Sequence, residues 1–479
     1  MKPTATKTIS FHLNGEAVET SAAPGRLLLD YLRRDLRAVG TKEGCREGDC
    51  GACTILFGKH NAQGELIYRA VPSCMLLMGH AQGGYVVTIE GLRVGKGLNG
   101  VQQAVVDCGG SQCGFCTPGF IVSFTGFVLN GTEFSVEEAT HAISGNLCRC
   151  TGYVSLVRAA AALIGGLPDL PEPGLERNRR LVEAQLLPEF FGREVAQMPA
   201  EEIGGLPSEA PFVGGGTDLI VQRGEAFNLE APRFARDLSR KPAIRVKGDE
   251  LCLPGETTFE ELRECTLLGK WWPTSRTDLE RFASPIVRER ASLAGNIANA
   301  SPIADGTAIF LGLGADLVLT GAGGTRRVAL GDFFHGYKQT ELQPGERIAS
   351  LRLPKAQTGH RFHFEKISKR EYLDIASINS GLGIQVRDGV IDAVQLSAGG
   401  VAPIPLLMRQ TAACLIGKPV NAQTVLEAVP VLEAEATPIS DVRGSADYKR
   451  LGLRQLFFAH FLALFPNEVD EGQLMEVTR

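Results

Sequence analysis

Eight of the twelve cysteines in this chain fall into two groups of four whose spacing suits metal ligation. In the first group, four residues separate Cys45 from Cys50 and two separate Cys50 from Cys53, while Cys74 follows in the segment VPSCML. Three thiolates from one tight loop and a fourth from a separate segment are the spacing of plant-type ferredoxins. We therefore predict that these four cysteines ligate one iron–sulfur cluster.

The second group consists of Cys113, Cys116, Cys148 and Cys150. The surrounding segments have the pattern of helices separated by Gly and Pro, with the first two cysteines at the start of one helix and the last two at the end of another. Helix N-termini favour the negative charge of a thiolate-ligated cluster. Four thiolates from two helix ends predict one compact site.

Zinc is the alternative metal for either group, because four cysteines also build structural zinc sites. Such sites usually use two short Cys-x-x-Cys pairs, and neither group has that symmetry, so iron–sulfur clusters are favoured. Cys108 is either an alternative ligand or a buried thiol. The remaining cysteines are expected in packed cores: Cys252, Cys265 and Cys414.

The elements around the first group predict an open β-sheet that carries a helix. The stretch KTISFHLNGEAVET alternates apolar and polar residues around Asn14-Gly15, a strong hairpin signal, and LLLDYLRRDL has the pattern of a short amphipathic helix. In the cysteine loop, Gly44, Gly48 and Gly51 are expected to allow positive φ angles and to turn backbone N–H groups toward cluster sulfurs.

The composition is that of an ordinary globular chain of roughly three domains, since 479 residues exceed what one core accommodates. With 44% hydrophobic residues, 22% charged residues and a formal net charge of −5, nothing indicates binding to nucleic acid or to a membrane. We find neither a signal-peptide pattern nor a long apolar run, and we expect a cytoplasmic protein. In a reducing compartment, clustered cysteines favour metal binding over disulfides.

The motifs GCREGDCGACTI, PSC, SQCGFCTPG and NLCRCTGY together resemble the iron–sulfur module of the xanthine oxidoreductase family of molybdenum hydroxylases. The resemblance implies one 2Fe-2S cluster in each cysteine group. It places the first in a β-grasp ferredoxin-like domain over 1–90 and the second in a helical-bundle domain over 91–165. It also implies that Gln112 approaches the pterin of a molybdenum cofactor, whereas the residue type alone is equally compatible with an ordinary loop amide.

Two glycine-containing loops further along the chain could hold a dinucleotide. The passage GGLPDLPEPG predicts a linker over 166–200, and PFVGGGTDLI then joins a short apolar strand to three glycines that would let backbone amides approach a pyrophosphate. The Gly-x-Gly-x-x-Gly fingerprint of Rossmann folds is not met. A second loop, in ERASLAGNIANASPIADGTAIF, offers Ser, Asn and Asp side chains that suit a phosphate and a ribose.

Together these loops resemble the flavin domain of the same family, which has the vanillyl-alcohol-oxidase type of FAD fold, and this implies an FAD-binding domain over 201–358. Phe282 would pack beside the isoalloxazine, although its type also suits a core position. The residues implied to contact FAD in the first loop are Phe212, Val213, Gly214, Gly215, Gly216, Thr217, Asp218 and Leu219. Those implied in the second are Ala291, Ser292, Gly295, Asn296, Asn299, Ser301 and Asp305, the last of which could instead cap a helix.

The final region, 359–479, alternates strands such as SGLGIQV with amphipathic helices and predicts a small α/β domain. Within it, FEKISKREYLDIASIN resembles the family segment in which a lysine, here Lys366, contacts FAD; the charges alone could also form a solvated turn. Glu346 and Ile348 match positions at the isoalloxazine edge. The fold class is therefore predicted as a multidomain α+β protein.

Clusters that pass single electrons and a flavin that handles one or two describe an electron conduit. The resemblance implies the small subunit of the bacterial two-subunit members, carrying electrons from hypoxanthine or xanthine hydroxylation to FAD and then to NAD. Hydroxylation itself would occur at the molybdenum cofactor of a large molybdopterin-binding partner, in an α2β2 heterotetramer. Two alternatives remain: a sister hydroxylase acting on an aldehyde or another N-heterocycle, and a stand-alone iron–sulfur flavoprotein reductase or redox sensor.

Overall fold

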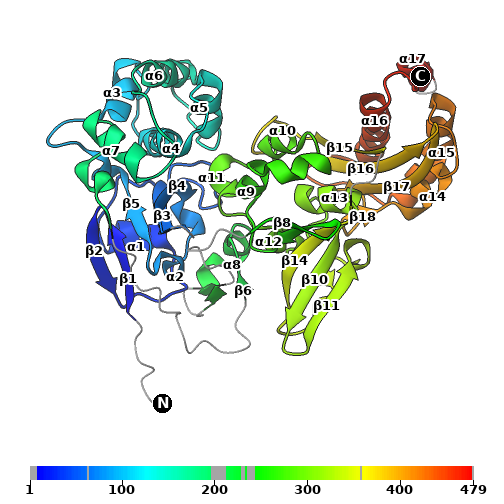
Figure 1. Ribbon diagram of the computed structural model, residues 1–479, viewed down its shortest axis with the longest axis horizontal. Helices are drawn as coiled ribbons and strands as arrows, with labels where there is room; N and C mark the ends of the chain where they lie inside the picture. Colours follow the sequence, from blue (N-terminus) through cyan, green and yellow to red (C-terminus); the bar gives the residue numbers. More distant parts are fainter. Residues whose placement is uncertain are drawn as a thin grey trace. The chain divides into compact units, whose positions relative to one another are not determined.

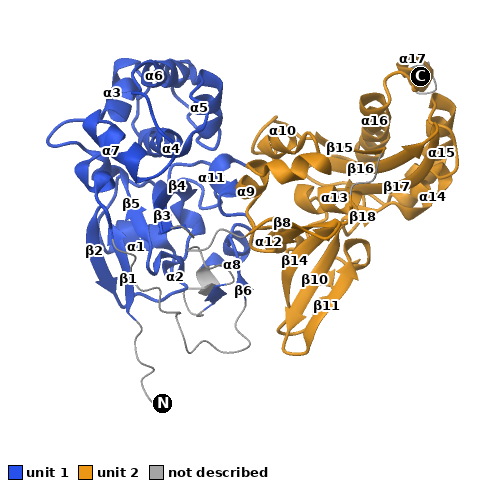
Figure 2. Cartoon of the chain, viewed as in Figure 1, with its two compact units in different colours: residues 1–241, 284–291 blue, residues 242–283, 292–479 orange. Residues whose placement is uncertain are grey.

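The structure is a computed structural model that describes residues 8–61, 64–195, 212–227, 232–234, 243–355 and 359–476. The chain divides into two compact units, drawn in different colours in Figure 2. Unit 1 comprises Met1–Lys241 and Ser284–Ala291, and unit 2 comprises Pro242–Ala283 and Ser292–Arg479. Eight residues from the middle of the chain thus pack with unit 1.

Unit 1 opens with a five-stranded mixed sheet in the order β2-β1-β5-β3-β4 (Figure 1). β1 runs antiparallel to β2 and parallel to β5, and β3 runs antiparallel to β4 and β5. The predicted hairpin is confirmed: Asn14 and Gly15 have φ angles of 54° and 90°, which a two-residue turn of this type requires. The strands are β1 Ile9–Leu13, β2 Glu16–Thr20, β3 Thr54–His60, β4 Leu66–Pro72 and β5 Tyr85–Val87.

The predicted amphipathic helix is α1, Leu28–Arg34, and it packs on one face of this sheet. Leu28 and Leu32 are fully buried in a core shared with Phe11 and Val86, while Arg33 and Arg34 end the helix on its polar side. The mixed sheet covered by this helix is the β-grasp arrangement that was predicted. Short helical turns follow β4, η1 Ser73–Met75 and α2 Met78–Ala81, and η2 Ile89–Leu92 follows β5.

A bundle of helices completes the iron–sulfur part of unit 1. Helix α4 is buried along most of its length because it packs against β3 and β4 as well as against other helices. Pro118 is tolerated near the start of α4, because a backbone N–H in the first turn of a helix has no partner within the helix. Gly131 caps the C-terminal end. The bundle helices are α3 Gly100–Asp107, α4 Thr117–Asn130, α5 Val136–Ala142 and α6 Val154–Gly165.

The stretch predicted as a linker, 166–200, contains ordered structure: helix α7 Leu175–Glu183 and the turn η3 Glu189–Gly192. Leu181 and Phe191 from this stretch lie in the core of the helical bundle. The side chain of Arg177 is also buried and donates hydrogen bonds to the carbonyl oxygens of Pro171 (2.7 Å), Leu129 (3.3 Å) and Gly131 (2.7 Å). The Pro- and Gly-rich passage is therefore fastened to the C-terminal end of α4.

The described residues of unit 2 form two large antiparallel sheets and a two-stranded one, β12 Phe334–Gly336 with β13 Gln339–Thr340. The first has the order β11-β10-β14-β9-β8, and the second has the order β15-β16-β17-β18. The first is built from β8 Arg245–Lys247, β9 Glu250–Pro254, β10 Asp316–Gly321, β11 Gly324–Ala329 and β14 Arg347–Leu353. The second is built from β15 His360–Ile367, β16 Ile378–Arg387, β17 Val390–Gly399 and β18 Leu406–Leu407.

Helices cover both faces of the second sheet. Helix α13 crosses β16 at Gly381 and Gly383, where an added Cβ would lie 3.1 Å from the carbonyl oxygen of Ala308 and 2.1 Å from that of Gly312. Helix α16 packs on Ile367 and Ile378, which point to the opposite face because residues alternate along a strand. The helices of unit 2 are α9 Phe259–Arg263, α10 Ser275–Glu280, α12 Leu293–Ala298, α13 Asp305–Gly312, α14 Arg409–Leu415, α15 Ala422–Glu435, α16 Ala446–Leu464 and α17 Glu471–Glu476.

The helices in the described ranges are all too short or too polar to cross a lipid bilayer.

We predict that Arg177→Met destabilises the helical bundle by about 2 kcal/mol, because buried carbonyl groups lose a charged hydrogen-bond donor. Hydrogen exchange of peptides from α4 and α7, followed by mass spectrometry, should accelerate about thirty-fold. Arg179→Met is the matched control, since Arg179 lies on the same helix but is half exposed, and its contacts to Gly192 and Glu194 are 3.3 and 3.4 Å long. Equal exchange rates in both variants would contradict the role assigned to Arg177.

Candidate functional site

The four cysteines of the first group lie together in unit 1. Cys45, Cys50 and Cys53 lie between α1 and β3, and Cys74 lies in η1. They form two pairs, because the Cys50 thiol hydrogen-bonds to Cys45 and the Cys74 thiol to Cys53. The second pair is buried and the first is partly exposed. Two pairs of thiols match a cluster in which each of two irons takes two cysteine ligands.

Backbone geometry explains how one short loop brings these sulfurs together. Gly48 and Gly51 have positive φ angles of 80° and 64°, as predicted, and a side chain at Gly51 would collide with Asn146. Gly44 is required for a different reason: an added Cβ would lie 2.7 Å from the sulfur of Cys50. The backbone N–H groups of Glu47 and Cys50 point at Cys45 Sγ, at 3.3 and 3.4 Å.

These contacts shift the pKa values of Cys45 and Cys50 in opposite directions. The hydrogen bond from Cys50, supported by backbone N–H groups of the loop, lowers the pKa of Cys45 to about 5. The same shared proton, together with burial, raises the pKa of Cys50. One member of the pair is thus ready to bind a metal as a thiolate near neutral pH.

The second group also forms two pairs. Cys113 and Cys150 lie 3.7 Å apart and are exposed, while Cys116, at the start of α4, is hydrogen-bonded to Cys148. Burial, followed by this hydrogen bond, raises the pKa of Cys116 to about 12. Burial would also raise the pKa of Cys148, but the hydroxyl and N–H of Thr151, at 3.1 and 3.4 Å, outweigh it and lower that pKa.

One predicted position in this group was wrong. Cys148 and Cys150 do not end a helix, because α5 stops at Ala142 and both cysteines lie in the loop that precedes α6. That loop is held by Asn146, which is buried and accepts a hydrogen bond from Ser123 at 2.7 Å. The cysteines therefore come from a loop and from the start of α4.

Asn146 also joins the two cysteine sites, a contact that no motif in the sequence indicated. Its side-chain amide donates to the carbonyl oxygen of Gly51 at 3.0 Å, and the N–H of Leu147 donates to the carbonyl oxygen of Cys50 at 3.0 Å. The loop of the first group is thus hydrogen-bonded directly to the loop of the second. In the sequence, the position of Asn146 two residues before Cys148 was the one sign that it could matter for the cysteine site. Its role is seen only in the long-range hydrogen bond to Gly51.

The first glycine-rich loop, 212–219, lies in unit 1 beside the first cysteine group. β6 Phe212–Val213 runs parallel to β7 Arg233–Phe234, and helix α8 Leu219–Phe227 follows the loop. Val213 and Ile220 lie in one buried apolar cluster with Cys53 and Cys74. His80, which stacks edge-on against Phe234, approaches the carbonyl oxygen of Gly214 at 3.4 Å.

Within this loop, Gly216 has a φ of 81° and Gly215 is packed so tightly that a side chain would overlap the carbonyl group of Arg290. Thr217 is half-buried and Asp218 is exposed, so polar groups remain at the surface of the loop. A turn built from glycines, with one φ in the left-handed region, has the character of a phosphate-binding loop. These features fit FAD.

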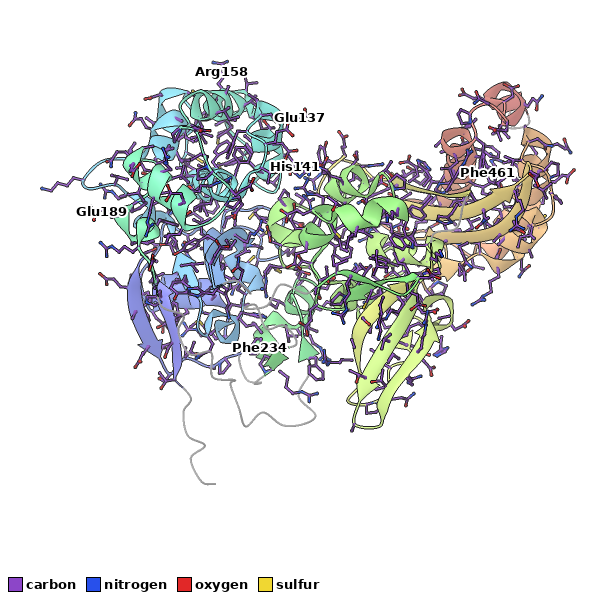
Figure 3. The ribbon with its side chains drawn as sticks, in the orientation of Figure 1. Glu137, His141, Arg158, Glu189, Phe234 and Phe461 are labelled. Atoms are coloured by element: carbon purple, nitrogen blue, oxygen red, sulfur yellow. The ribbon has the colours of Figure 1, made fainter. Side chains whose placement is uncertain are left out.

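The segment Ser284–Ala291, with helix α11 Pro285–Arg288, touches both cluster-binding domains of unit 1. Arg288 is fully buried and donates to the ring of His141, labelled in Figure 3, at 2.9 Å. Glu289 forms an ion pair with Arg69 of β4 at 3.4 Å. Ala291, predicted near FAD, ends this segment and is buried.

The second predicted flavin loop lies in unit 2. Ser292 caps α12 by accepting the N–H of Gly295 at 3.2 Å, and Asn296 accepts a hydrogen bond from Thr307 at 3.2 Å. Asn299 accepts from Lys338, with 2.9 Å between the side chains. Ser301 is half-buried just before α13. These residues form a polar turn, and their contacts to FAD remain a prediction.

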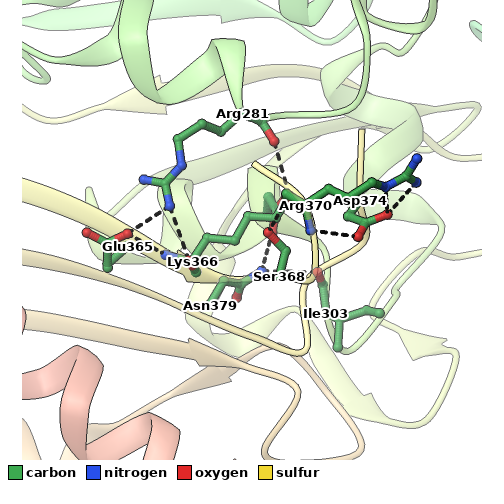
Figure 4. A network of polar contacts seen from close by, with 9 residues as sticks. Arg281, Ile303, Glu365, Lys366, Ser368, Arg370, Asp374 and Asn379 are labelled. Carbon is green, nitrogen blue, oxygen red and sulfur yellow. Dashed lines mark hydrogen bonds and ion pairs between the residues drawn. The ribbon is translucent and has the colours of Figure 1, made fainter. Parts of the chain in front are cut away.

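Asp305 and Lys366 form a buried ion pair at 2.7 Å in unit 2. The side chain of Lys366 is 1% exposed and also donates to the carbonyl oxygen of Arg281 at 3.1 Å; both residues are labelled in Figure 4. Asn379 donates to the other oxygen of Asp305 at 2.5 Å. Asp305 is the first residue of α13 and uses its side chain for this network, while Ala304 is the residue at the helix cap.

The other predicted flavin neighbours in unit 2 contact other residues of the protein. Phe282 stacks on Phe259 with 3.9 Å between ring centroids, so it occupies a core position in this structure. Two hydrogen bonds of 2.8 Å from Arg326 lower the pKa of Glu346 to about 2. Ile348 is buried in β14. Gln112 is exposed in the loop before Cys113, in unit 1.

Comparison with family models identifies all four parts of the chain. Residues 11–77 match a 2Fe-2S iron-sulfur cluster binding domain and residues 88–161 match a [2Fe-2S] binding domain. Residues 194–356 match the FAD binding domain in molybdopterin dehydrogenase, and residues 363–464 match the CO dehydrogenase flavoprotein C-terminal domain. The chain therefore combines two 2Fe-2S domains with an FAD-binding domain and a C-terminal flavoprotein domain.

Known proteins similar to this chain include xanthine dehydrogenase from Emericella nidulans, 28% identical over 95% of this chain and 38% of the relative. Aldehyde oxidase 1 from Bos taurus is 26% identical over 94% of this chain and 39% of the relative. The chain thus spans about two fifths of these relatives. A solved structure, carbon monoxide dehydrogenase from Hydrogenophaga pseudoflava lacking the Mo-pyranopterin moiety, aligns with a TM-score of 0.50 and 25% identity, covering 54% of this chain and 91% of the other.

We predict that iodoacetamide at pH 6.5 alkylates Cys45 faster than Cys50 in the cluster-free chain, because the lowered pKa of Cys45 keeps it a thiolate at this pH. The rate at Cys45 should fall as the pH drops through about 5, where the sulfur is protonated. Peptide mapping by mass spectrometry measures both rates. Cys50→Ala should slow the reaction at Cys45, whereas Cys252→Ser, at a buried cysteine outside both groups, should leave it unchanged.

Proposed function

We propose that this chain is the electron-transfer subunit of a molybdenum hydroxylase, and that the hydroxylase is a xanthine dehydrogenase. Electrons from purine hydroxylation on a large molybdopterin-binding partner would pass through the two clusters to FAD and then to NAD. The observation that carries the proposal is the continuity of the sites in unit 1. The two cysteine loops are hydrogen-bonded through Asn146, and the glycine-rich loop shares an apolar cluster with Cys53 and Cys74.

The order of transfer follows from exposure. Cys113 and Cys150 are exposed, so the second site is accessible to a partner that delivers electrons. Cys53 and Cys74 are buried and lie next to Val213 of the glycine-rich loop, so the first site is the neighbour of that loop. Electrons entering at the surface would therefore pass from the second site to the first and on to the flavin.

FAD supplies the step that converts single electrons from clusters into the two-electron chemistry of a nicotinamide. The chain's own residues would hold the reacting groups in place. Eight thiolates would ligate the clusters, and the backbone N–H groups of Glu47 and Cys50 would stabilise the sulfur of Cys45. The glycine-rich loop would bind the FAD pyrophosphate. In unit 2, the Asp305–Lys366 pair would order the polar turn that begins at Ser292.

The purine substrate and the NAD acceptor are the finer part of the proposal. Xanthine dehydrogenases among the relatives support a purine, whereas aldehyde oxidase and carbon monoxide dehydrogenase support a sister hydroxylase with another substrate. In either case the substrate would bind to the partner. We propose a cytoplasmic heterotetramer with two copies of each subunit, in which Gln112, exposed beside Cys113, faces the partner's pterin.

The test is an anaerobic visible spectrum of the chain purified with its large partner, before and after adding xanthine. We expect xanthine to bleach the flavin and cluster bands and NAD to restore them. If NADH bleaches the bands and xanthine does not, electron transfer stands and the purine assignment fails. If neither reagent acts on cofactor-loaded protein, the proposal as a whole fails.

A variant makes the route testable. In Cys150→Ser, which lacks one ligand of the second cluster, xanthine should no longer reduce the flavin, because electrons must enter through that cluster. NADH should still reduce it, since the first cluster and the FAD domain are intact. Cys108→Ser, at a nearby cysteine outside the four-residue set, is the matched control and should respond to both reagents.

A further inference from the structure

Arg46 has an unusual backbone conformation for its residue type. It lies directly after Cys45 and has a φ of 61°, in the left-handed region that favours glycine. The turn at this position directs the N–H groups of Glu47 and Cys50 at Cys45 Sγ. A side chain with a Cβ makes this conformation costly, so other contacts must hold the turn.

Those contacts come from two carboxylates. One guanidinium nitrogen of Arg46 donates to Asp30 of α1 at 2.6 Å and another donates to Glu43 at 2.8 Å. The side chain of Asp30 is only 7% exposed, whereas that of Glu43 is 33% exposed. Because solvent screens the exposed pair, the contact with buried Asp30 is the stronger of the two.

Asp30 is placed to act as a fixed anchor. It lies on α1, whose neighbouring residues Leu29 and Tyr31 are buried in apolar clusters. Within the described part of the chain, its second oxygen accepts no hydrogen bond, and its ionic partner is Arg34, 3.7 Å away and 67% exposed. A buried carboxylate with one close charged partner loses most of its compensation if that partner moves. The pair therefore holds Arg46 tightly.

We propose that Asp30 is a positioning residue for the first cluster: by holding Arg46 in the left-handed turn, it keeps the N–H groups of Glu47 and Cys50 on the sulfur of Cys45. This inference rests on the proposed function and deepens it by naming what tunes the cluster. Hydrogen bonds to cluster sulfurs raise the reduction potential, because they stabilise the more negative reduced state. Loosening the turn therefore lowers the potential.

Asp30→Ala also removes a negative charge near the cluster, and this change by itself raises the reduction potential. The charge effect must therefore be separated from the lowering caused by a loosened turn. Arg46→Gly provides the separation, since glycine adopts a positive φ without an anchor. In the Arg46→Gly background, the charge of Asp30 still affects the potential, but Asp30 no longer stabilises the turn at residue 46. The difference between the two backgrounds isolates the positioning role.

The experiment is a redox titration of the purified complex, monitored by electron paramagnetic resonance of the first cluster, with the second cluster as internal reference. We expect Asp30→Ala to lower the midpoint potential of the first cluster when residue 46 is arginine, and not to lower it in the Arg46→Gly background. An identical shift in both backgrounds would overturn the proposal, because Asp30 would then act through charge alone.

Asp35→Ala is the matched control, since Asp35 lies at the end of the same helix and pairs with Arg26 at the surface. It removes the same charge, and its effect should not depend on residue 46. If Asp30→Ala fails to assemble the first cluster but the double variant with Arg46→Gly assembles it, the proposal is supported; failure of both overturns it. The potential requires neither xanthine nor NAD, so failure of the proposed function would be recorded separately.

Discussion

The carbonyl group of Gly51 lies at a tightly packed point of unit 1, and the arrangement of both cysteine sites depends on it. This carbonyl oxygen accepts a hydrogen bond from the side-chain amide of Asn146. An added Cβ at Gly119 of α4 would collide with the same oxygen. Glycine at 51 and 119 lets the cysteine loop, α4 and the loop before α6 approach one another at backbone distance. The two cysteine sites are consequently parts of one packed structure.

The same closeness extends to the flavin-binding part of unit 1. The glycine-rich loop buries Val213 and Ile220 against Cys53 and Cys74, and the segment containing α11 reaches the two cluster domains through Arg288 and Glu289. Buried apolar contacts and short hydrogen bonds between successive sites keep their separation constant. A constant, short separation is what electron transfer between fixed cofactors requires. Unit 1 thus positions the two cysteine groups and the glycine-rich loop by packing together with hydrogen bonds.

Unit 2 uses a buried ion pair for a comparable purpose. Lys366 is almost fully enclosed and is compensated by Asp305 and by the carbonyl oxygen of Arg281, while Asn379 satisfies the second oxygen of Asp305. Burying one charge without the other would be expensive, so β15, β16 and α13 must assemble together. This network orders the end of the polar turn that begins at Ser292. It gives the C-terminal domain a structural role beside the proposed flavin contacts.

The local patterns were sufficient for the cysteine groups, the hairpin at Asn14-Gly15 and helix α1, because ligand spacing, turn chemistry and amphipathic periodicity are encoded within a few residues. They were not sufficient for the pairing of the thiols, the bridge made by Asn146, the burial of Arg177 or the position of Ser284–Ala291. Each of these depends on contacts between residues far apart in the chain. Such contacts form only when the backbone has closed on itself, so no short window of sequence contains them.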